Sequence, residues 1–300
     1  MRSEIPSWSG RLAETRRVAL AGGLVVALSL FGVDGAAAWL ATGHRQVALD
    51  AVAAVSADLP AFFRAGGATV GHAAIDPDVW RNRDTPGLAD REAPEHYLNL
   101  ELLGGKALPE RRDAYRRLLD RLHIAPRQAG ALPYAIVEGS ERLALCLAEH
   151  RRWPADEAIR AKCLLTAGWL AHYLADLTQP LHTTIHHDGR VRGKGASPHT
   201  GIHRRVDALL DAGGRSELAA PLAVDDLWAT VRSELLASHR LVDEVYRLEP
   251  KLETRGGRAD PRVATFAAER RRAAVRLIAG VFEWAWRRSA AIELPEWLRR

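Results

Sequence analysis

The sequence has little sulfur, with 2 cysteines and 1 methionine among 300 residues. A zinc ribbon or a disulfide framework needs more cysteines than this chain has. A metal site would therefore have to use histidine and carboxylate ligands. The two cysteines, Cys146 and Cys163, flank a turn at Trp153–Asp156, so two antiparallel helices would bring them close together. Their spacing fits both a disulfide and a pair of buried thiols.

Two common catalytic signatures are also missing. The nearest approach to a phosphate-binding glycine loop is Gly104-Gly105-Lys106, but Ala107 follows where that loop needs serine or threonine. No motif of a nucleophilic serine is present. Alternating runs of β-branched residues are scarce, which argues against a sheet as the main architecture.

Long apolar runs are absent except near the amino terminus. There, Arg16-Arg17 precede an apolar run over 18–33, and the small residues Ala36, Ala37 and Ala38 follow it. This order is typical of a secretory signal, and the run is shorter than the ~20 residues of a comfortable membrane span. We expect a signal peptide over 1–38 and a mature, secreted or periplasmic chain over 39–300. Export before or after folding stays open.

The remaining sequence predicts one all-α domain. Hydrophobic residues make up 47% of the chain and charged residues 26%, and from Gly43 onward the apolar positions recur at intervals of three and four. The predicted helices are His44–Val55, Pro109–His123, Leu132–Glu149, Asp156–Leu177, His199–Leu210, Asp225–Arg247 and Pro261–Ala290, with Asp156 and Asp225 as N-caps and Gly213-Gly214 as a stop. Two stretches, Gly66–Lys106 and His186–Pro198, are predicted to be long functional loops.

Histidine and aspartate recur at helical spacing in one part of the chain. His172 and Asp176 are four residues apart, so on a helix both project from one face. Pro180 would end that helix and let His182 approach the same region. A second pair, His203 and Asp207, has the same spacing. Together these residues predict a site for metal ions, most naturally zinc. Zinc activates water and neutralises phosphate oxygens, so phosphoester hydrolysis is the predicted chemistry.

The order of these residues resembles a known family. The string from His172 through Asp176 and Gln179-Pro180-Leu181-His182, followed by His203 and Asp207, is similar to the superfamily of zinc-dependent phospholipases C and single-strand-specific zinc nucleases. That family has a mostly helical domain and three zinc ions, and its mature chain begins with a tryptophan that ligates through its amino nitrogen and carbonyl. Here Trp39 directly follows the small residues of the predicted cleavage site.

The resemblance assigns nine ligands to three zinc ions. It gives the first ion Trp39, His44 and Asp176, the second Asp78, His96, His172 and the bridging Asp176, and the third His182, His203 and Asp207. Asp78 is preferred to Asp76 because the family has an Asp-x-x-Arg arrangement, and Asp78 is also the expected catalytic base. Asn99 replaces an acidic residue that often follows the family's equivalent of His96.

The substrate stays open between two classes. The short spacing from Trp39 to His44, and Asp207 where phospholipases have glutamate, favour a nuclease acting on single-stranded DNA, RNA or 3′-nucleotides. The family's Gly-Gly-Asn segment is absent, and the chain has His186-His187-Asp188 there instead. Hydrolysis of phospholipids by a phospholipase C-like enzyme is the alternative. A non-catalytic binding module stabilised by metal is a third hypothesis.

Several other residues have weaker functional interpretations. His186, His187 and His199 are expected to be solvated loop residues rather than ligands. Trp80 or Tyr97 would stack on a base, although packing is the commoner role of such aromatics. The net charge of +5 suits a polyanionic substrate, and Arg190, Arg192 and Lys194 would steer either a nucleic-acid backbone or a lipid phosphate.

Overall fold

The computed structural model describes residues 41–298, apart from 194, 212–218 and 253–259. These residues fall within one unit, Ala36–Arg300. They contain helices, turns and an isolated bridge between Leu98 and Gly130, and no strand occurs among them. The prediction of an all-α fold is confirmed. The predicted signal segment 1–38, the ligand Trp39 and the stop at Gly213-Gly214 lie outside the described residues.

The described helices follow one another in a simple order. The α-helices are α1 (Ala41–Ala54), α2 (Ala61–Ala65), α3 (Gly67–Ala73), α4 (Asp76–Val79), α5 (Pro86–Glu92), α6 (Arg112–Leu122), α7 (Pro126–Ala129), α8 (Leu132–Arg152), α9 (Glu157–Thr178), α10 (Ile202–Asp211), α11 (Leu227–His239), α12 (Val242–Leu248) and α13 (Pro261–Ser289). The 3₁₀ helices are η1 (Ala93–His96), η2 (Leu100–Leu103), η3 (Pro180–Thr183) and η4 (Glu249–Lys251). None of these helices is both long and apolar enough to cross a membrane.

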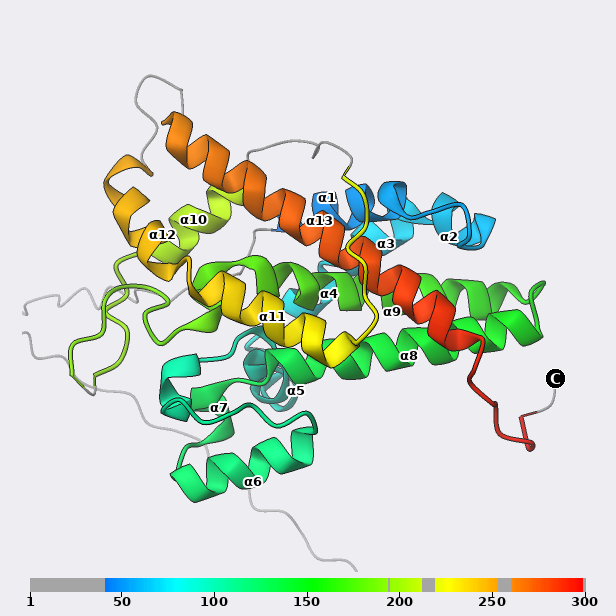
Figure 1. The fold of residues 1–300 in the computed structure, drawn as a ribbon, viewed down its shortest axis with the longest axis horizontal. Coiled ribbons are helices and arrows are strands. Elements are labelled where there is room, and N and C mark those ends of the chain that lie inside the picture. The colour runs from blue at the N-terminus through cyan, green and yellow to red at the C-terminus, as the bar shows by residue number, and fades with distance from the viewer. Residues whose placement is uncertain (1–40, 194, 212–218, 253–259, 299–300) are drawn as a thin grey trace, which may run out of the picture. The chain divides into compact units, whose positions relative to one another are not determined.

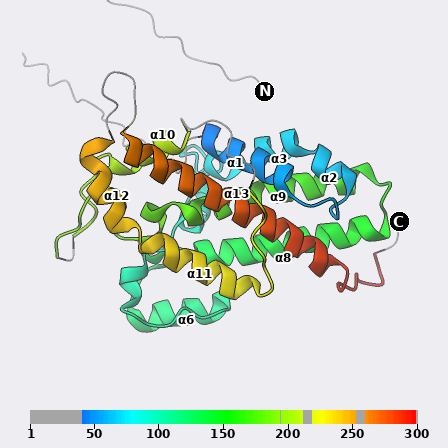
Figure 2. The same cartoon turned by 45° about the horizontal axis from the view of Figure 1, so that its top comes forward.

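Two long helices, α8 and α9, form the centre of the fold as an antiparallel pair (Figure 1). The second half of α9, from Thr166 to Thr178, is buried almost throughout, as expected of a helix that is covered on all sides. α13 packs along both central helices, and α1 packs against α3, α9 and α13 (Figure 1, Figure 2). The chain after position 210 therefore supplies a helix that covers the central pair.

A glycine sets the close approach of α3 to α9. A Cβ atom added at Gly168 would lie 2.5 Å from the Cβ of Ala73 and 2.6 Å from the carbonyl oxygen of Val70. Real Cβ atoms do not come this close to such neighbours. The absence of a side chain at Gly168 therefore lets α3 end against α9, one turn before His172.

Most of the predicted helices agree with the structure to within a few residues. The exception is the predicted helix Asp225–Arg247, which the structure divides into α11 and α12, with Arg240 and Leu241 between them. Asp156 is the N-cap of α9, as predicted, and accepts hydrogen bonds from the backbone N–H groups of Ala158 and Ile159. The predicted N-cap Asp225 is wrong, because Asp226 accepts the capping hydrogen bond of α11 from Ala229.

The prediction of a long loop over Gly66–Lys106 is also wrong, because α3, α4, α5, η1 and η2 lie within it. Backbone hydrogen bonds tie this segment to distant parts of the chain: Leu98 N–H donates to the carbonyl of His182 at 2.8 Å, and Ala131 N–H donates to that of Pro94 at 2.7 Å. The backbone of Gly130 lies close to that of Tyr97 in this segment. This approach requires glycine, because the φ of Gly130 is 83° and a Cβ there would lie 2.0 Å from the carbonyl oxygen of Tyr97.

The cysteines occupy the interface of the two central helices. Both Cys146, on α8, and Cys163, on α9, are buried free thiols. Of the two alternatives left open by their spacing, the structure has the thiol pair. Burial raises the pKa of the Cys163 thiol to about 12, which keeps it protonated and unreactive near neutral pH.

Candidate metal centre

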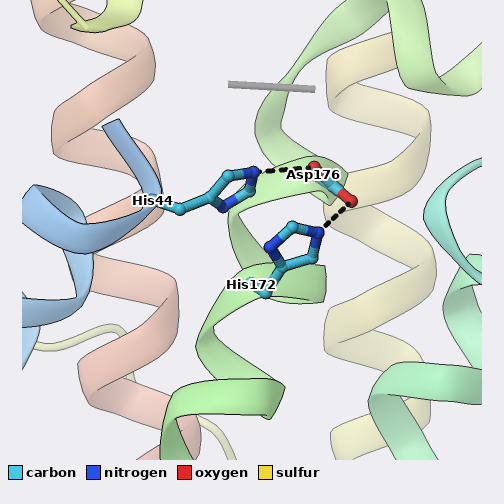
Figure 3. Close-up of side chains that lie close together, drawn as sticks. All are labelled: His44, His172 and Asp176. Atoms are coloured by element: carbon cyan, nitrogen blue, oxygen red, sulfur yellow. Dashed lines mark ion pairs between the residues drawn. The ribbon is translucent and has the colours of Figure 1, made fainter. Parts of the chain in front are cut away.

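Helix α9 places His172 and Asp176 side by side in the interior. Both side chains have no exposed surface, and Nε2 of His172 lies 3.4 Å from Oδ2 of Asp176. Their spacing of four residues puts them on one face of α9, as predicted. His44 enters from α1 and points at the other carboxylate oxygen, with its Nε2 3.5 Å from Oδ1 (Figure 3). The rings of His44 and His172 stack with their centroids 3.8 Å apart.

The segment predicted as a loop brings Asp78 and His96 to the same place. His96, at the end of η1, has its Nδ1 3.1 Å from Oδ2 of Asp176 and 3.0 Å from Nε2 of His172. Oδ1 of Asp78, on α4, lies 3.9 Å from Nδ1 of His96 and 4.0 Å from Nε2 of His172. Residues from four separate segments therefore meet around one buried carboxylate.

The last three predicted ligands lie beside this cluster. His182, on η3, has its Nδ1 3.7 Å from Oδ1 of Asp176, and its ring lies edge-on to that of His203 with 4.9 Å between centroids. On α10, Nε2 of His203 lies 3.6 Å from Oδ2 of Asp207. The three residues are neighbours and all are buried.

Two groups in the described part of the chain have ligand atoms within 4.8 Å of one another, as a metal ion requires: His44, His172 and Asp176, and Asp78, His96 and His172. They share His172. The set of His182, His203 and Asp207 is not drawn together so closely. The structure thus brings five of the predicted ligands, His44, Asp78, His96, His172 and Asp176, close enough to share cations, whereas His182, His203 and Asp207 form no such group.

The donor set and its unpaired atoms fit a bound cation. Oδ1 of Asp176, Nε2 of His182 and both ring nitrogens of His203 are buried and have no hydrogen-bond partner among the described residues. Each such group costs about 1–3 kcal/mol when left unsatisfied. Imidazole nitrogens and carboxylate oxygens are preferred ligands of zinc, so zinc bound here would satisfy these atoms together.

The protonation states of His44, His182, His203 and Asp176 also suit metal binding. Burial, and then the neighbouring His172, lower the pKa of His44 to about 3. Burial also lowers the pKa of His182 and holds that of His203 well below its usual value. Burial alone would raise the pKa of the Asp176 carboxyl, but the facing imidazoles of His182 and His172 hold it well below its usual range. Neutral imidazoles and an ionised carboxylate are the forms that bind cations.

Backbone carbonyls fix the orientation of two of the rings. Nδ1–H of His172 donates to the carbonyl oxygen of Ala74 at 2.9 Å, and Nδ1–H of His182 donates to that of His96. In both rings this leaves Nε2 as the nitrogen with a free lone pair, and in His172 it is Nε2 that faces Asp176. The close contact of α3 with α9 at Gly168 supports the first of these hydrogen bonds.

Three further residues support the ligands, and sequence reasoning gave them no role. Oε1 of the buried Glu92 lies 3.5 Å from Nε2 of His96 and accepts a hydrogen bond from the hydroxyl of Tyr173. Burial alone would lower the pKa of His96, but hydrogen bonds with Asp176 and Glu92 raise it. The amide of Gln179 donates to Oδ1 of Asp207 at 2.8 Å. Such partners orient metal ligands and raise their affinity.

Arg81 lies on the more open side of the cluster. Its guanidinium donates to Oδ1 of Asp78 at 3.0 Å, and the two side chains retain 24% and 15% of their exposure, whereas Asp176 retains none. The positive charge of Arg81 also acts to lower the pKa of His96, His182 and His203, which favours their neutral forms. The Asp-x-x-Arg spacing in the sequence includes this arginine. It was used only to prefer Asp78 to Asp76 as a ligand, and no role was assigned to Arg81 itself.

Comparison with protein-family models finds no match, and comparison with curated proteins finds none either. Among solved structures, the chain is similar to an alpha toxin from Clostridium absonum, with a TM-score of 0.39 and 11% sequence identity. The similarity covers 85% of this chain and 64% of the toxin chain. A similarity of this size carries no inference about activity, so the centre rests on its own geometry.

The histidine-rich loop differs from its prediction in part. His199 is exposed, as expected, but His186 and His187 are half-buried. The hydroxyl of Tyr246 donates to the carbonyl of His186 at 2.6 Å and accepts from the N–H of Gly189, and these contacts hold the loop against α12. The ring of His187 consequently lies 6.2 Å from that of His203, beside the predicted third ion.

The other weaker interpretations have mixed outcomes. Arg190 pairs with Asp243 at 2.5 Å and covers the ring of Tyr246, so part of its role is to hold the loop. Trp80 packs edge-on against Trp169, and the hydroxyl of Tyr97 donates to the carbonyl of Arg127. Lys194 lies outside the described residues.

Proposed function

We propose that this chain is a zinc-dependent phosphodiesterase that hydrolyses phosphoester bonds of single-stranded nucleic acid or of 3′-nucleotides. The observation that carries the proposal is the position of Asp176. Its Oδ1 faces His44 and its Oδ2 faces His96 and His172, all within 3.5 Å. A fully buried carboxylate with different nitrogen ligands at each oxygen has the geometry of a bridge between two cations.

The proposed ligand sets are the ones that the family resemblance of the sequence implies. Trp39, His44 and Asp176 would hold one zinc ion; Asp78, His96, His172 and Asp176 a second; His182, His203 and Asp207 a third. The first set needs the amino group of Trp39, which is free only after removal of residues 1–38, so the proposal includes export and cleavage of this segment. An α-amino group has a pKa near ~8 and loses its proton readily to a metal ion.

The residues of the centre would have different roles in the reaction. Bound zinc would supply a Lewis acid for phosphate oxygens and would lower the pKa of water. Asp78 is the most exposed of the proposed carboxylate ligands, so it can accept the proton of an attacking water and pass it to solvent. Arg81, which Asp78 holds in place, is positioned to bind a non-bridging phosphate oxygen and the negative charge that develops on it.

The choice of nucleic acid over phospholipid rests on the sequence. It is supported by the spacing of Trp39 and His44, by aspartate at position 207 and by a net charge of +5. Long-range attraction to a polyanion follows from that charge. Phospholipid is the alternative substrate, and the experiment must include it.

A metal count combined with a set of substrates tests the proposal. The mature protein should bind zinc and hydrolyse single-stranded DNA, RNA or a 3′-nucleotide, and a chelator should abolish this hydrolysis. Hydrolysis of phosphatidylcholine alone would contradict the nuclease assignment. A full complement of zinc without hydrolysis of any substrate would favour a structural role of the metal.

A pair of variants ties the activity to the bridging carboxylate. Asp176→Asn should lose zinc and activity together. Asp50→Asn is the matched control, because Asp50 is also buried but accepts a hydrogen bond from Gln46, outside the cluster. Equal zinc content in wild type and Asp176→Asn would contradict the proposed centre, whatever the substrate.

A further inference from the structure

A cavity of about 830 Å³ lies beside the metal centre, between η1, α5, α6, α8 and α9. Glu92 and Tyr173, which support His96, form part of its wall, and so does Trp80, two residues after Asp78. Its volume lies within the range of sites for small ligands, which is roughly 300–1,000 Å³. None of the proposed zinc ligands lines it. The cavity is therefore a neighbour of the centre rather than the centre itself.

The acidic and basic groups of this cavity are equal in number, but the carboxylates all have a basic neighbour whereas two of the arginines have no acidic one within the part that the structure describes. Four carboxylates and four guanidinium groups line it: Asp90, Glu92, Glu95, Glu138, Arg91, Arg112, Arg116 and Arg142. Each carboxylate lies within 4 Å of a basic group, namely Arg127 for Asp90, His96 for Glu92, and Arg112 for both Glu95 and Glu138. The exposed Arg91 and Arg116 form no ion pair with any described residue. The charges still available at the rim are therefore positive.

The remaining lining offers flat aromatic surface. Trp80 and Trp169, 5.2 Å apart between ring centroids, stand on the side toward α4, and both are half-buried. The indole of Trp169 donates to Asp76 at 2.8 Å, which fixes that ring and leaves Trp80 packed against a rigid partner. Aromatic rings of this kind stack on bases irrespective of sequence, and unpaired arginines bind backbone phosphates.

We propose that this cavity binds a nucleotide of a single-stranded substrate that flanks the phosphodiester at the metal centre. Arg91 and Arg116 hold its phosphate, and Trp80 contacts its base. The inference rests on the proposed function, because the strand must pass from Asp78 and Arg81 to Trp80. A lipid chain suits the cavity poorly, since it would desolvate the charged groups of the lining without pairing them.

Binding of a labelled strand tests this site in the zinc-loaded protein. The probe is a fluorescein-labelled single-stranded decanucleotide with phosphorothioate linkages, and fluorescence anisotropy gives its Kd at several salt concentrations. Arg91→Glu/Arg116→Glu is compared with Arg121→Glu/Arg262→Glu, which makes the same change of charge at two exposed arginines outside the cavity.

The two double variants should differ in a defined way. Each lost phosphate contact on a single strand removes about 0.7 from the slope of log K against log salt. Arg91→Glu/Arg116→Glu should therefore lower the slope by about 1.4 and weaken binding about 25-fold at 0.1 M salt. The control pair should retain the wild-type slope. Equal losses in both pairs, or a strand that fails to bind the wild type, would overturn the proposal.

A second comparison tests whether a base occupies the cavity. A strand with abasic sites should bind the wild type more weakly than the normal strand, and Trp80→Leu should reduce this preference. Equal affinity of the wild type for both strands would overturn the nucleotide assignment.

Hydrolysis of an unmodified strand is scored separately, since it reports on the proposed function. Strand hydrolysis with cavity variants that match the control would overturn the cavity site alone. Cavity-dependent binding without hydrolysis would support the site and contradict the proposed function.

Discussion

Replacing Glu92 by glutamine isolates the contribution of a residue that touches no metal ion. Glu92 is 8% exposed, with Oε1 3.5 Å from Nε2 of His96. A carboxylate in this position favours a proton on Nε2 of His96, so that Nδ1, which faces Asp176 and Asp78, is the nitrogen that would ligate a cation. Glutamine has nearly the same size but no charge, so Glu92→Gln weakens this preference without opening a cavity.

The expected magnitude follows from the contact distance. Removing a partner of a metal-bound histidine typically lowers metal affinity about 10–100-fold. The separation of 3.5 Å exceeds that of a strong hydrogen bond, so the Coulomb attraction is the main term and the loss should lie near the lower limit. We expect zinc affinity to fall about tenfold, which corresponds to about 1.4 kcal/mol. Tyr173→Phe, which removes only the hydroxyl that orients Glu92, should cause a smaller loss.

Competition with a chromophoric chelator of known zinc affinity measures this loss. Asp90→Asn is the matched control, because Asp90 lies on the same helix, α5, makes the same change from carboxylate to amide and is 67% exposed. Thermal unfolding with and without zinc separates loss of metal from loss of fold. Zinc affinity within twofold of wild type for Glu92→Gln, or an equal loss in Asp90→Asn, would refute the reasoning.

Three further predictions concern the surroundings of the centre. Gly168→Ala should lower the free energy of unfolding by about 1–3 kcal/mol, because its Cβ would meet α3; in urea unfolding, Gly139→Ala, which meets only a flexible leucine, should lose much less. Protein that retains Ala36–Ala38 before Trp39 should bind less zinc and turn over more slowly, and equal metal content by elemental analysis would contradict the role of the amino terminus. Burial raises the pKa of the Asp211 carboxyl to about 6, although the hydrogen bonds that this carboxyl accepts at the start of α1 act to lower it. The contribution of Asp211 to the stability of the fold therefore falls as pH rises from about 4 to about 6. Asp211→Asn should therefore be more stable relative to wild type at pH 7 than at pH 4.5 in denaturant titrations, and a constant difference would contradict this sign.

The sequence predicted the ligands best where they lie on long helices. His172 and Asp176 are four residues apart on a helix of 22 residues, so periodicity alone placed both on one face. Asp78 and His96 lie on short helical turns of four residues each, which carry too little periodicity to be separated from a loop. Their identity as candidates came from the family resemblance, and only the folded chain brings them to Asp176.

Two of the supporting residues, Glu92 and Tyr173, had no detectable sequence signal, whereas Gln179 stood in the motif that carried the family resemblance. Tyr173 and Glu92 are separated by 81 positions, and nothing in either neighbourhood indicates that the two side chains meet. The division between α11 and α12 was not predicted either. The apolar spacing continues across Arg240 and Leu241, but the helix ends before these residues and a new one begins after them. Periodicity predicts which face of a helix is buried, but tertiary packing decides where a helix stops.

The contacts around the centre imply that its two sides depend on metal to different degrees. The segments that carry His96 and His182 hold each other directly, because Leu98 N–H donates to the carbonyl of His182 and the His182 ring donates to that of His96. These hydrogen bonds need no cation. On α10, by contrast, His203 has no hydrogen-bond partner for its ring, and Asp207 is bonded through Gln179. The positions of His96 and His182 are thus fixed by hydrogen bonds within the protein, whereas the ring of His203, like Oδ1 of Asp176, is buried without a hydrogen-bond partner and would be satisfied by a bound cation.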